Sequence, residues 1–182
     1  NCTELKTLDL PDSVETIGYG AFAYCSNLRS LQLPTTLEHI DNYAFQNCDG
    51  ITGGLTIPAS VSSIGSYAFY DCDGFNGKLV IEANDGMTIG SNAFYSCGGF
   101  TGLELGNGIT SIGDKEFSGC TNLEQIILSD QITMINSETF KGCTALSQVD
   151  WPDSLETIDY HTFAGCEETI RSNIEDCHHA WG

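Results

Sequence analysis

The side chains best able to do chemistry are nine cysteines and four histidines. Three of them are adjacent near the end of the chain, at Cys177, His178 and His179. These are zinc-ligand types, but neighbouring ligands rarely converge on one ion, and no second cluster completes the four positions of a structural site. We therefore expect no metal there.

Residues 71–77, Asp-Cys-Asp-Gly-Phe-Asn-Gly, have the acidic spacing of a calcium loop. An EF-hand loop also needs an oxygen ligand at its fifth position, glycine at its sixth and glutamate at its twelfth. The fifth position is Phe75 and the sixth is Asn76, and only Glu82 at the twelfth fits. No calcium and no other cofactor is expected.

Paired carboxylates could cleave glycosidic bonds, which requires two acids within roughly 5 to 10 Å of each other. On the outward side of the strands described below, the acids are Asp9, Glu104 and Asp150. With about 4.8 Å between neighbouring strands, they are at least two copies apart, and no histidine or second acid lies beside them. The chain is therefore not expected to be an enzyme.

The cysteines indicate an internal repeat instead. A phenylalanine recurs in steps of 23 to 25 residues, and a cysteine follows each one three positions later. The pairs are Phe22–Cys25, Phe45–Cys48, Phe69–Cys72, Phe94–Cys97, Phe117–Cys120, Phe140–Cys143 and Phe163–Cys166. Because these cysteines share one repeat position, we expect buried free thiols. A disulfide between stacked neighbours stays the alternative, which would need suitably directed Cβ atoms.

Apolar residues keep the same phase through the rest of each copy. A pair separated by one residue, such as Leu79 and Ile81, has the period of a β-strand, and proline follows such a pair in four copies. A second apolar pair, such as Val61 and Ile64, leads to the next phenylalanine. One copy cannot bury these residues alone, so the pattern predicts stacked copies whose strands form a parallel sheet.

The remaining segments of the unit also carry expectations. Residues 66–69, Ser-Tyr-Ala-Phe, and their equivalents are predicted to form a short helical or 3₁₀ turn. Glycine-rich insertions at 49–54, 73–77 and 98–102 should bulge before their strands. Residues 1–166 would form one solenoid of about seven repeats of 23–25 residues, and residues 167–182 an end cap or tail.

The pattern Cys-x-x-Leu-x-x-Leu-x-Leu-Pro-x-x-Val-x-x-Ile-Gly-x-x-Ala-Phe, clearest in residues 2–25 and 25–48, resembles the BspA-like leucine-rich repeats. The resemblance implies a leucine-rich-repeat solenoid, a right-handed superhelix, in a surface or secreted protein of bacteria or protozoa. It also implies an adhesive role, with no shared catalytic residues. Glu82, Gly106 and Ser129 stand where the pattern has proline, and the pattern assigns no binding surface.

The charge excludes two classes of partner. The net charge is −19, with only six lysines and arginines. Such a surface repels nucleic acid and anionic lipid. No apolar run approaches the ~20 residues that span a bilayer. The chain starts at Asn1 without a signal peptide, and we expect it to be a piece of a longer protein.

One candidate surface lies on the outward side of the predicted sheet. Lys78, Val80, Gln125 and Ile127 occupy outward strand positions in the middle and later copies. Exposed β-branched side chains there could be binding contacts. The alternative is that they reflect ordinary strand propensity.

A second candidate surface is made of tyrosines. All seven lie within three residues of a repeat phenylalanine, and six belong to the first four copies. Stacking would gather them along one edge, and tyrosine is favoured at interfaces. We single out Tyr43, Tyr67, Tyr70 and Tyr95 as candidate contacts. The alternative is that each ring covers its own turn.

The sequence therefore predicts noncatalytic recognition of a host, matrix or cell-surface protein or glycan, by a chain located outside the cell or at its surface. The first alternative is a structural spacer that presents another domain. A glycan-cleaving enzyme is less favoured. Exposed repeat ends would also allow end-to-end self-association.

Overall fold

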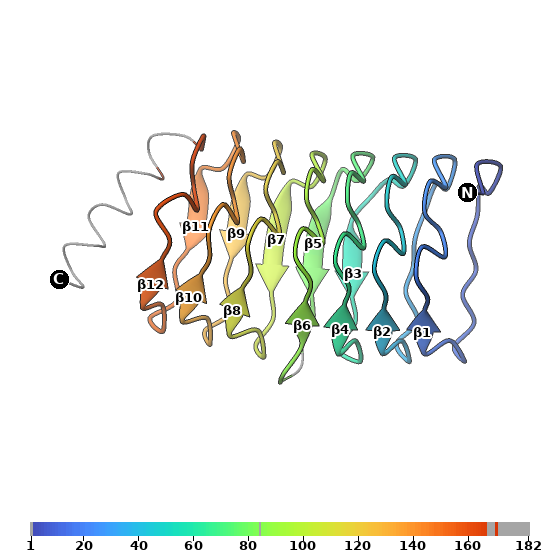
Figure 1. Ribbon diagram of the computed structural model, residues 1–182, viewed down its shortest axis with the longest axis horizontal. Coiled ribbons are helices and arrows are strands. Elements are labelled where there is room, and N and C mark those ends of the chain that lie inside the picture. The colour runs from blue at the N-terminus through green and yellow to red at the C-terminus, as the bar shows by residue number, and fades with distance from the viewer. Residues whose placement is uncertain (1, 84, 167–169, 171–182) are drawn as a thin grey trace.

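In a computed structural model the chain is an elongated solenoid, with the first and last strands at opposite ends of its long axis (Figure 1). The structure describes residues 2–83, 85–166 and 170. All strand pairs in these residues are parallel, and each joins equivalent positions of neighbouring copies. The predicted repeat solenoid is confirmed. No described helix has the length and apolar character needed to cross a membrane.

The first apolar pair of five copies forms one sheet. Its strands are β3 (Leu55–Ile57), β5 (Lys78–Ile81), β7 (Gly102–Leu105), β9 (Gln125–Ile127) and β11 (Gln148–Asp150), in the order β11-β9-β7-β5-β3. Leu79 of β5 pairs with Leu55 on one side and Leu103 on the other, and all three are buried. The residues between such positions face outward, as the period of two requires.

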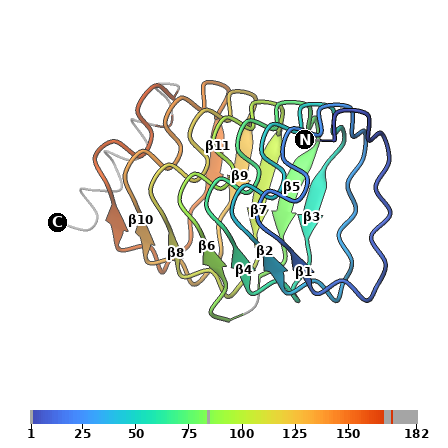
Figure 2. The ribbon, with the colours of Figure 1, turned by 45° about the vertical axis from the view of Figure 1, so that its right-hand side comes forward.

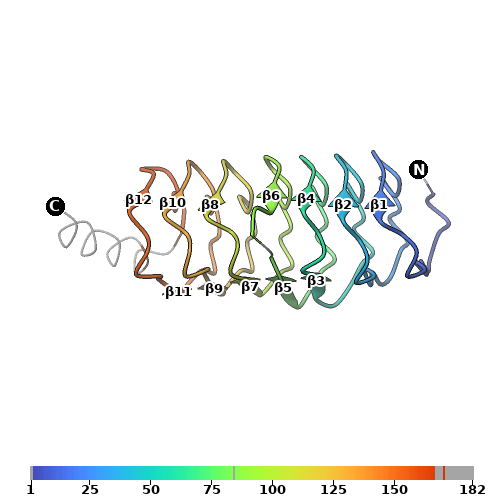
Figure 3. The same ribbon diagram turned by 90° about the horizontal axis from the view of Figure 1, so that it is seen from below.

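The second apolar pair forms a further line of two-residue strands, which the sequence analysis did not predict. The four-stranded part holds β1 (Thr16–Ile17), β2 (His39–Ile40), β4 (Ser63–Ile64) and β6 (Thr88–Ile89). The three-stranded part holds β8 (Ser111–Ile112), β10 (Met134–Ile135) and β12 (Thr157–Ile158). Figures 2 and 3 show this line and the five-stranded sheet running along different sides of the solenoid.

The turns around the repeat phenylalanines differ from the helical or 3₁₀ turns predicted. In the first six copies, two residues with positive φ flank each phenylalanine, as Tyr67 (58°) and Asp71 (57°) flank Phe69. The N–H groups of Tyr67, Phe69 and Asp71 donate to carbonyls of the next copy at 3.2, 2.8 and 2.9 Å, respectively. A helix would use such donors inside one copy. The turns therefore form a third backbone ladder along the molecule.

Two rows of side chains fill the space beneath these turns. The phenylalanine rings from Phe22 to Phe163 stack copy on copy, with centroids 5.1 to 5.6 Å apart. Beside them lie seven buried cysteines, of which the six from Cys25 to Cys143 have free thiols, while Cys2 is exposed. From Cys48 to Cys166, each thiol donates to the carbonyl of the preceding copy's phenylalanine. The shared cysteine phase thus marks a core position, as predicted.

The predicted end cap or tail falls almost wholly outside the described residues. Within 167–182 only Ile170 is described, and it is buried. The Cys177-His178-His179 segment, set aside as a zinc site, also lies outside them.

Candidate recognition surface

Five tyrosines form one continuous chain of ring contacts across the first four copies. Ring centroids are 5.4 Å apart from Tyr19 to Tyr43, 5.3 Å from Tyr43 to Tyr67, 5.5 Å from Tyr67 to Tyr70 and 5.5 Å from Tyr70 to Tyr95. We call these five residues the tyrosine row. The structure thus brings together four of the candidate contacts, Tyr43, Tyr67, Tyr70 and Tyr95, on the turn edge of the solenoid.

The turn ladder positions the row. Tyr43 and Tyr67 occupy the positive-φ position two residues before the phenylalanine, and Tyr70 and Tyr95 come one residue after it. Asn92 has the same positive-φ position in the next copy. Because asparagine tolerates this backbone region and a bulky side chain does not favour it, backbone preference does not explain the tyrosines.

The stacking decides which part of each ring faces solvent. Tyr43 and Tyr67 are within 5° of parallel, and Tyr70 and Tyr95 within 8°. A ring stacked on its neighbour has little free face, so these half-buried side chains present edges and phenolic hydroxyls. Tyr19, at the N-terminal end of the row, is 73% exposed and meets Tyr43 edge-on.

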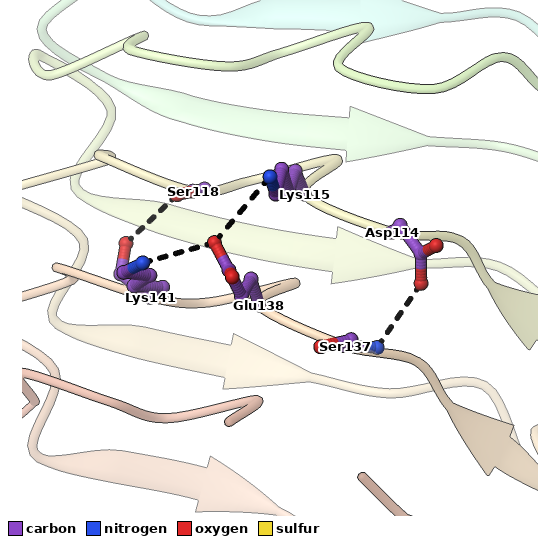
Figure 4. A network of polar contacts seen from close by, with 6 residues as sticks. All are labelled: Asp114, Lys115, Ser118, Ser137, Glu138 and Lys141. Atoms are coloured by element: carbon purple, nitrogen blue, oxygen red, sulfur yellow. Dashed lines mark hydrogen bonds and ion pairs between the residues drawn. The ribbon is translucent and has the colours of Figure 1, made fainter. Parts of the chain in front are cut away.

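The same edge becomes charged in the following copies (Figure 4). The Nζ atoms of Lys141 and Lys115 lie 3.0 and 3.6 Å from Oε2 of Glu138. The hydrogen bond from Lys141 and the charge of Lys115 hold the pKa of the Glu138 carboxyl below its ordinary value. Lys115 and Glu138 stand at the repeat position of Tyr43 and Tyr67. The row is therefore confined to the N-terminal copies.

Asp71 lies against the middle of the row, and two further carboxylates lie close to Asp71 or to each other. We call Asp49, Asp71 and Asp73 the acidic cluster. Burial, then the charges of Asp71 and Asp73, raise the pKa of Asp49. Burial, then the neighbouring Asp71, raise the pKa of the Tyr70 hydroxyl. Asp71 and Asp73 are therefore close enough to repel Asp49, and Asp71 is close enough to act on the row.

The acidic cluster is held by polar groups and lacks a cationic partner. Asn47 Nδ2 donates to Asp71 Oδ2 at 2.8 Å, and the Gly98 N–H donates to Asp73 Oδ1 at 3.0 Å. In the part of the chain that the structure describes, both ion pairs involve Glu138. No group of three histidine, cysteine, aspartate or glutamate side chains there is arranged to hold a metal ion.

The four other candidate contacts lie on the five-stranded sheet, on elements separate from the row. Lys78 and Gln125 flank Gly102, and Val80 and Ile127 flank Glu104, on the neighbouring strands β5, β7 and β9. Val80, Gln125 and Ile127 are half-buried, while Glu104 is exposed between the two apolar residues. This charge divides the apolar surface of the sheet.

Comparison with known proteins identifies the repeat. The profile of the BspA type leucine-rich repeat region matches residues 1–77 and 87–178, in 6 copies. The chain belongs to this family. Family membership points in general to protein interaction or adhesion, on repeat scaffolds that are generally not enzymes. No protein of curated function matches the chain.

Several solved leucine-rich repeat proteins share the fold. One from Bacteroides ovatus is 28% identical, with a TM-score of 0.79 over 91% of this chain and 42% of its own. One from T. pallidum is 22% identical, with a TM-score of 0.82 over 94% of this chain and 82% of its own. A leucine-rich cell surface protein from Faecalibacterium prausnitzii is 22% identical, with a TM-score of 0.57 over 91% of this chain and 58% of its own. The chain thus spans less than half of the Bacteroides ovatus relative.

A shallow hollow beside the tyrosine row was not anticipated from the sequence. It has a volume of about 460 Å³ and crosses β2, β4 and β6, with Tyr19 at its rim. Its polar lining includes Asp41, Asn42, Ser63 and Ser66. The signal for it was the run of small and polar residues around the second strand position, such as Ser63, Gly65 and Ser66.

This BspA-type repeat departs from its own pattern at Glu116. Other copies have Ala44, Ala68 and Ala93 at the equivalent buried position, and Glu116 is only 2% exposed. The Gly113 N–H donates to its carboxyl, while Oε2 has no hydrogen-bond partner. Burial raises the pKa of Glu116 to about 8. The carboxyl faces the interior, so it does not meet a substrate.

Proposed function

We propose that this chain is a noncatalytic recognition module that binds a macromolecule, a protein or a glycan, through the turn edge carrying the tyrosine row. The observation that supports this proposal is the continuity of the row, with five rings in contact over four consecutive copies. Tyrosine provides large, rigid contact area at small cost in side-chain entropy. A regularly spaced row suits an extended partner surface.

We also propose a location outside the cell or at its surface, with an adhesive role. The BspA-type repeat and the fold shared with a cell surface protein of Faecalibacterium prausnitzii support this. The same proposal includes a secondary contact surface on the five-stranded sheet, made of Lys78, Val80, Gln125 and Ile127. It ranks second because the charged Glu104 lies between the apolar Val80 and Ile127.

The proposal predicts that two substitutions abolish most of the binding without disturbing the fold. Purified protein is applied to an array of matrix proteins and glycans at physiological salt. Tyr67→Asn and Tyr70→Gln introduce the residues found at the same repeat positions at Asn92 and Gln46. Loss of two aromatic contacts should weaken binding about tenfold or more, since hot-spot tyrosines contribute over ~1 kcal/mol each.

The matched control is Tyr160→Ser, because Tyr160 is 92% exposed outside the row and Ser137 has the equivalent position in the preceding copy. This variant should bind as the parent chain does. A folded, monomeric protein that binds nothing on the array would contradict the proposal and favour a structural spacer. If binding is unchanged by both row substitutions, the contact surface lies outside the tyrosine row.

A further inference from the structure

We propose that the tyrosine row and the acidic cluster together bind a basic segment of a partner protein, one that carries lysine or arginine side chains. This inference rests on the proposed recognition function and names its partner class. It is carried by the juxtaposition of two features, stacked rings that expose acceptor groups and carboxylates without a cationic partner.

The acidic cluster lacks the charge that a basic partner would supply. Asp49 is influenced by both Asp71 and Asp73, so bringing cations to this surface relieves repulsion already present in the free chain. The cations of the same edge, Lys115 in the fifth copy and Lys141 in the sixth, are already paired with Glu138. Ionised carboxylates are acceptors only, and the charged groups of lysine and arginine are donors only, so the two match.

The tyrosine row adds contact area suited to the same side chains. Lysine and arginine have long apolar stems that pack on apolar surface while the charged end stays with acceptors. The ring edges of Tyr67, Tyr70 and Tyr95 offer such a surface beside Asp71. The exposed ring of Tyr19, which is free on most of its surface, also offers a face to a cation.

The geometry disfavours the glycans that the recognition proposal leaves open. A neutral sugar ring packs its apolar side on the face of an aromatic ring, but four of the five rings in the row, all except Tyr19, are stacked in pairs at 5.3 and 5.5 Å. A sulfated or carboxylated glycan would meet the acidic cluster in a chain of net charge −19. A basic protein segment meets neither obstacle.

The test titrates the full chain, by calorimetry at low and at physiological salt, with four probes. They are a lysine- and arginine-containing peptide, an acidic peptide and an uncharged peptide of equal length, and a neutral oligosaccharide. The basic peptide should bind, more weakly as salt rises. Combining Asp71→Asn with Asp73→Asn removes two charges but keeps one acceptor oxygen on each side chain, and should weaken that binding about three- to tenfold.

The matched control is Glu104→Gln with Asp150→Asn, which removes the same charge from exposed positions of the five-stranded sheet. If the control weakens basic-peptide binding as much as the cluster variant does, attraction is general and the proposal is overturned. Preferred binding of the oligosaccharide, the acidic or the uncharged peptide overturns it as well. No binding by any of the four probes, while an array partner still binds through Tyr67 and Tyr70, overturns the basic-segment proposal and leaves the recognition proposal standing. If no partner on the array binds, both the recognition proposal and the basic-segment proposal are overturned.

Discussion

At the scale of single residues, Glu116 is the departure from the repeat with the clearest energetic consequence. It places an ionisable carboxyl at a buried repeat position that is occupied by Ala93 in the preceding copy and by Thr139 in the following copy. The buried hydroxyl of Thr139 is satisfied by hydrogen bonds in which it donates to the carbonyls of Gly113 and Asn136, at 2.8 and 2.9 Å. A carboxylate cannot donate unless it is protonated, so burial favours the protonated form.

This buried acid predicts a pH-dependent component of stability. The folded pKa of about 8 exceeds the ordinary 4.5, so the folded state holds the proton more tightly than the unfolded state. The contribution of Glu116 to stability is therefore most favourable below pH 4.5 and falls until the pH passes about 8, by a few kcal/mol at about 1.4 kcal/mol per pKa unit.

Glu116→Gln should remove that component, because the amide has nearly the same shape and does not titrate in this range. The measurement is urea unfolding of both proteins at a series of pH values between 4.5 and 8. Comparing the pair cancels the other carboxylates. Parallel pH profiles for parent and variant would contradict the assignment of a raised pKa to Glu116.

Sequence reasoning could predict the tyrosine row but not the acidic cluster. The tyrosines share a few repeat positions, so stacking alone brings them together. Asp49 and Asp73 share the repeat position after the cysteine, but Asp71 belongs to another position, and its approach to Asp49 depends on the positive-φ turn. Glu116 could have been noticed as an acid in an alanine position, but its burial depends on which way the turn faces.

At the scale of elements, backbone ladders explain both what the sequence predicted and what it did not. Strand period and proline located the five-stranded sheet. The second strand line was not predicted because its elements are only two residues long, too short for a period to appear. The turn ladder was missed because its positive-φ positions hold tyrosine, lysine and glutamate as well as glycine, such as Tyr67, Lys115 and Glu138.

The packing of neighbouring copies also explains why the insertions contain glycine. Gly50, Gly74 and Gly99 occupy one position, two residues after the cysteine. A Cβ atom there would lie 2.3, 2.1 and 1.7 Å, respectively, from carbonyl oxygens of the preceding copy. At this position the backbones of neighbouring copies approach so closely that a side chain does not fit.

Gly99→Ala should therefore destabilise the chain by about 1–3 kcal/mol, the usual cost of overpacking. Gly18→Ala is the control, since a Cβ atom at Gly18 meets nothing within 4 Å. Urea unfolding should show a lowered midpoint for Gly99→Ala and little change, or a slight gain, for Gly18→Ala. Equal midpoints for the two variants would show that the close approach is not needed.

At the scale of the whole molecule, the solenoid converts a sequence repeat into surfaces that run along its length. The turn edge changes character along the chain, from the tyrosine row in the first four copies to the Lys115, Glu138 and Lys141 network in the later ones. The five-stranded sheet has no such aromatic surface, and Glu104 divides its apolar residues. Such unequal sides favour a recognition module over an evenly polar spacer.

The measurement that tests this account most directly is NMR of the chain with isotope-labelled tyrosine rings, recorded with and without a partner captured from the array. Single Tyr→Phe variants assign the seven ring signals. We predict that partner binding shifts the signals of Tyr43, Tyr67, Tyr70 and Tyr95 and leaves Tyr160 unchanged. Unshifted row signals in a saturated complex, or a shift confined to Tyr160, would contradict recognition through the tyrosine row.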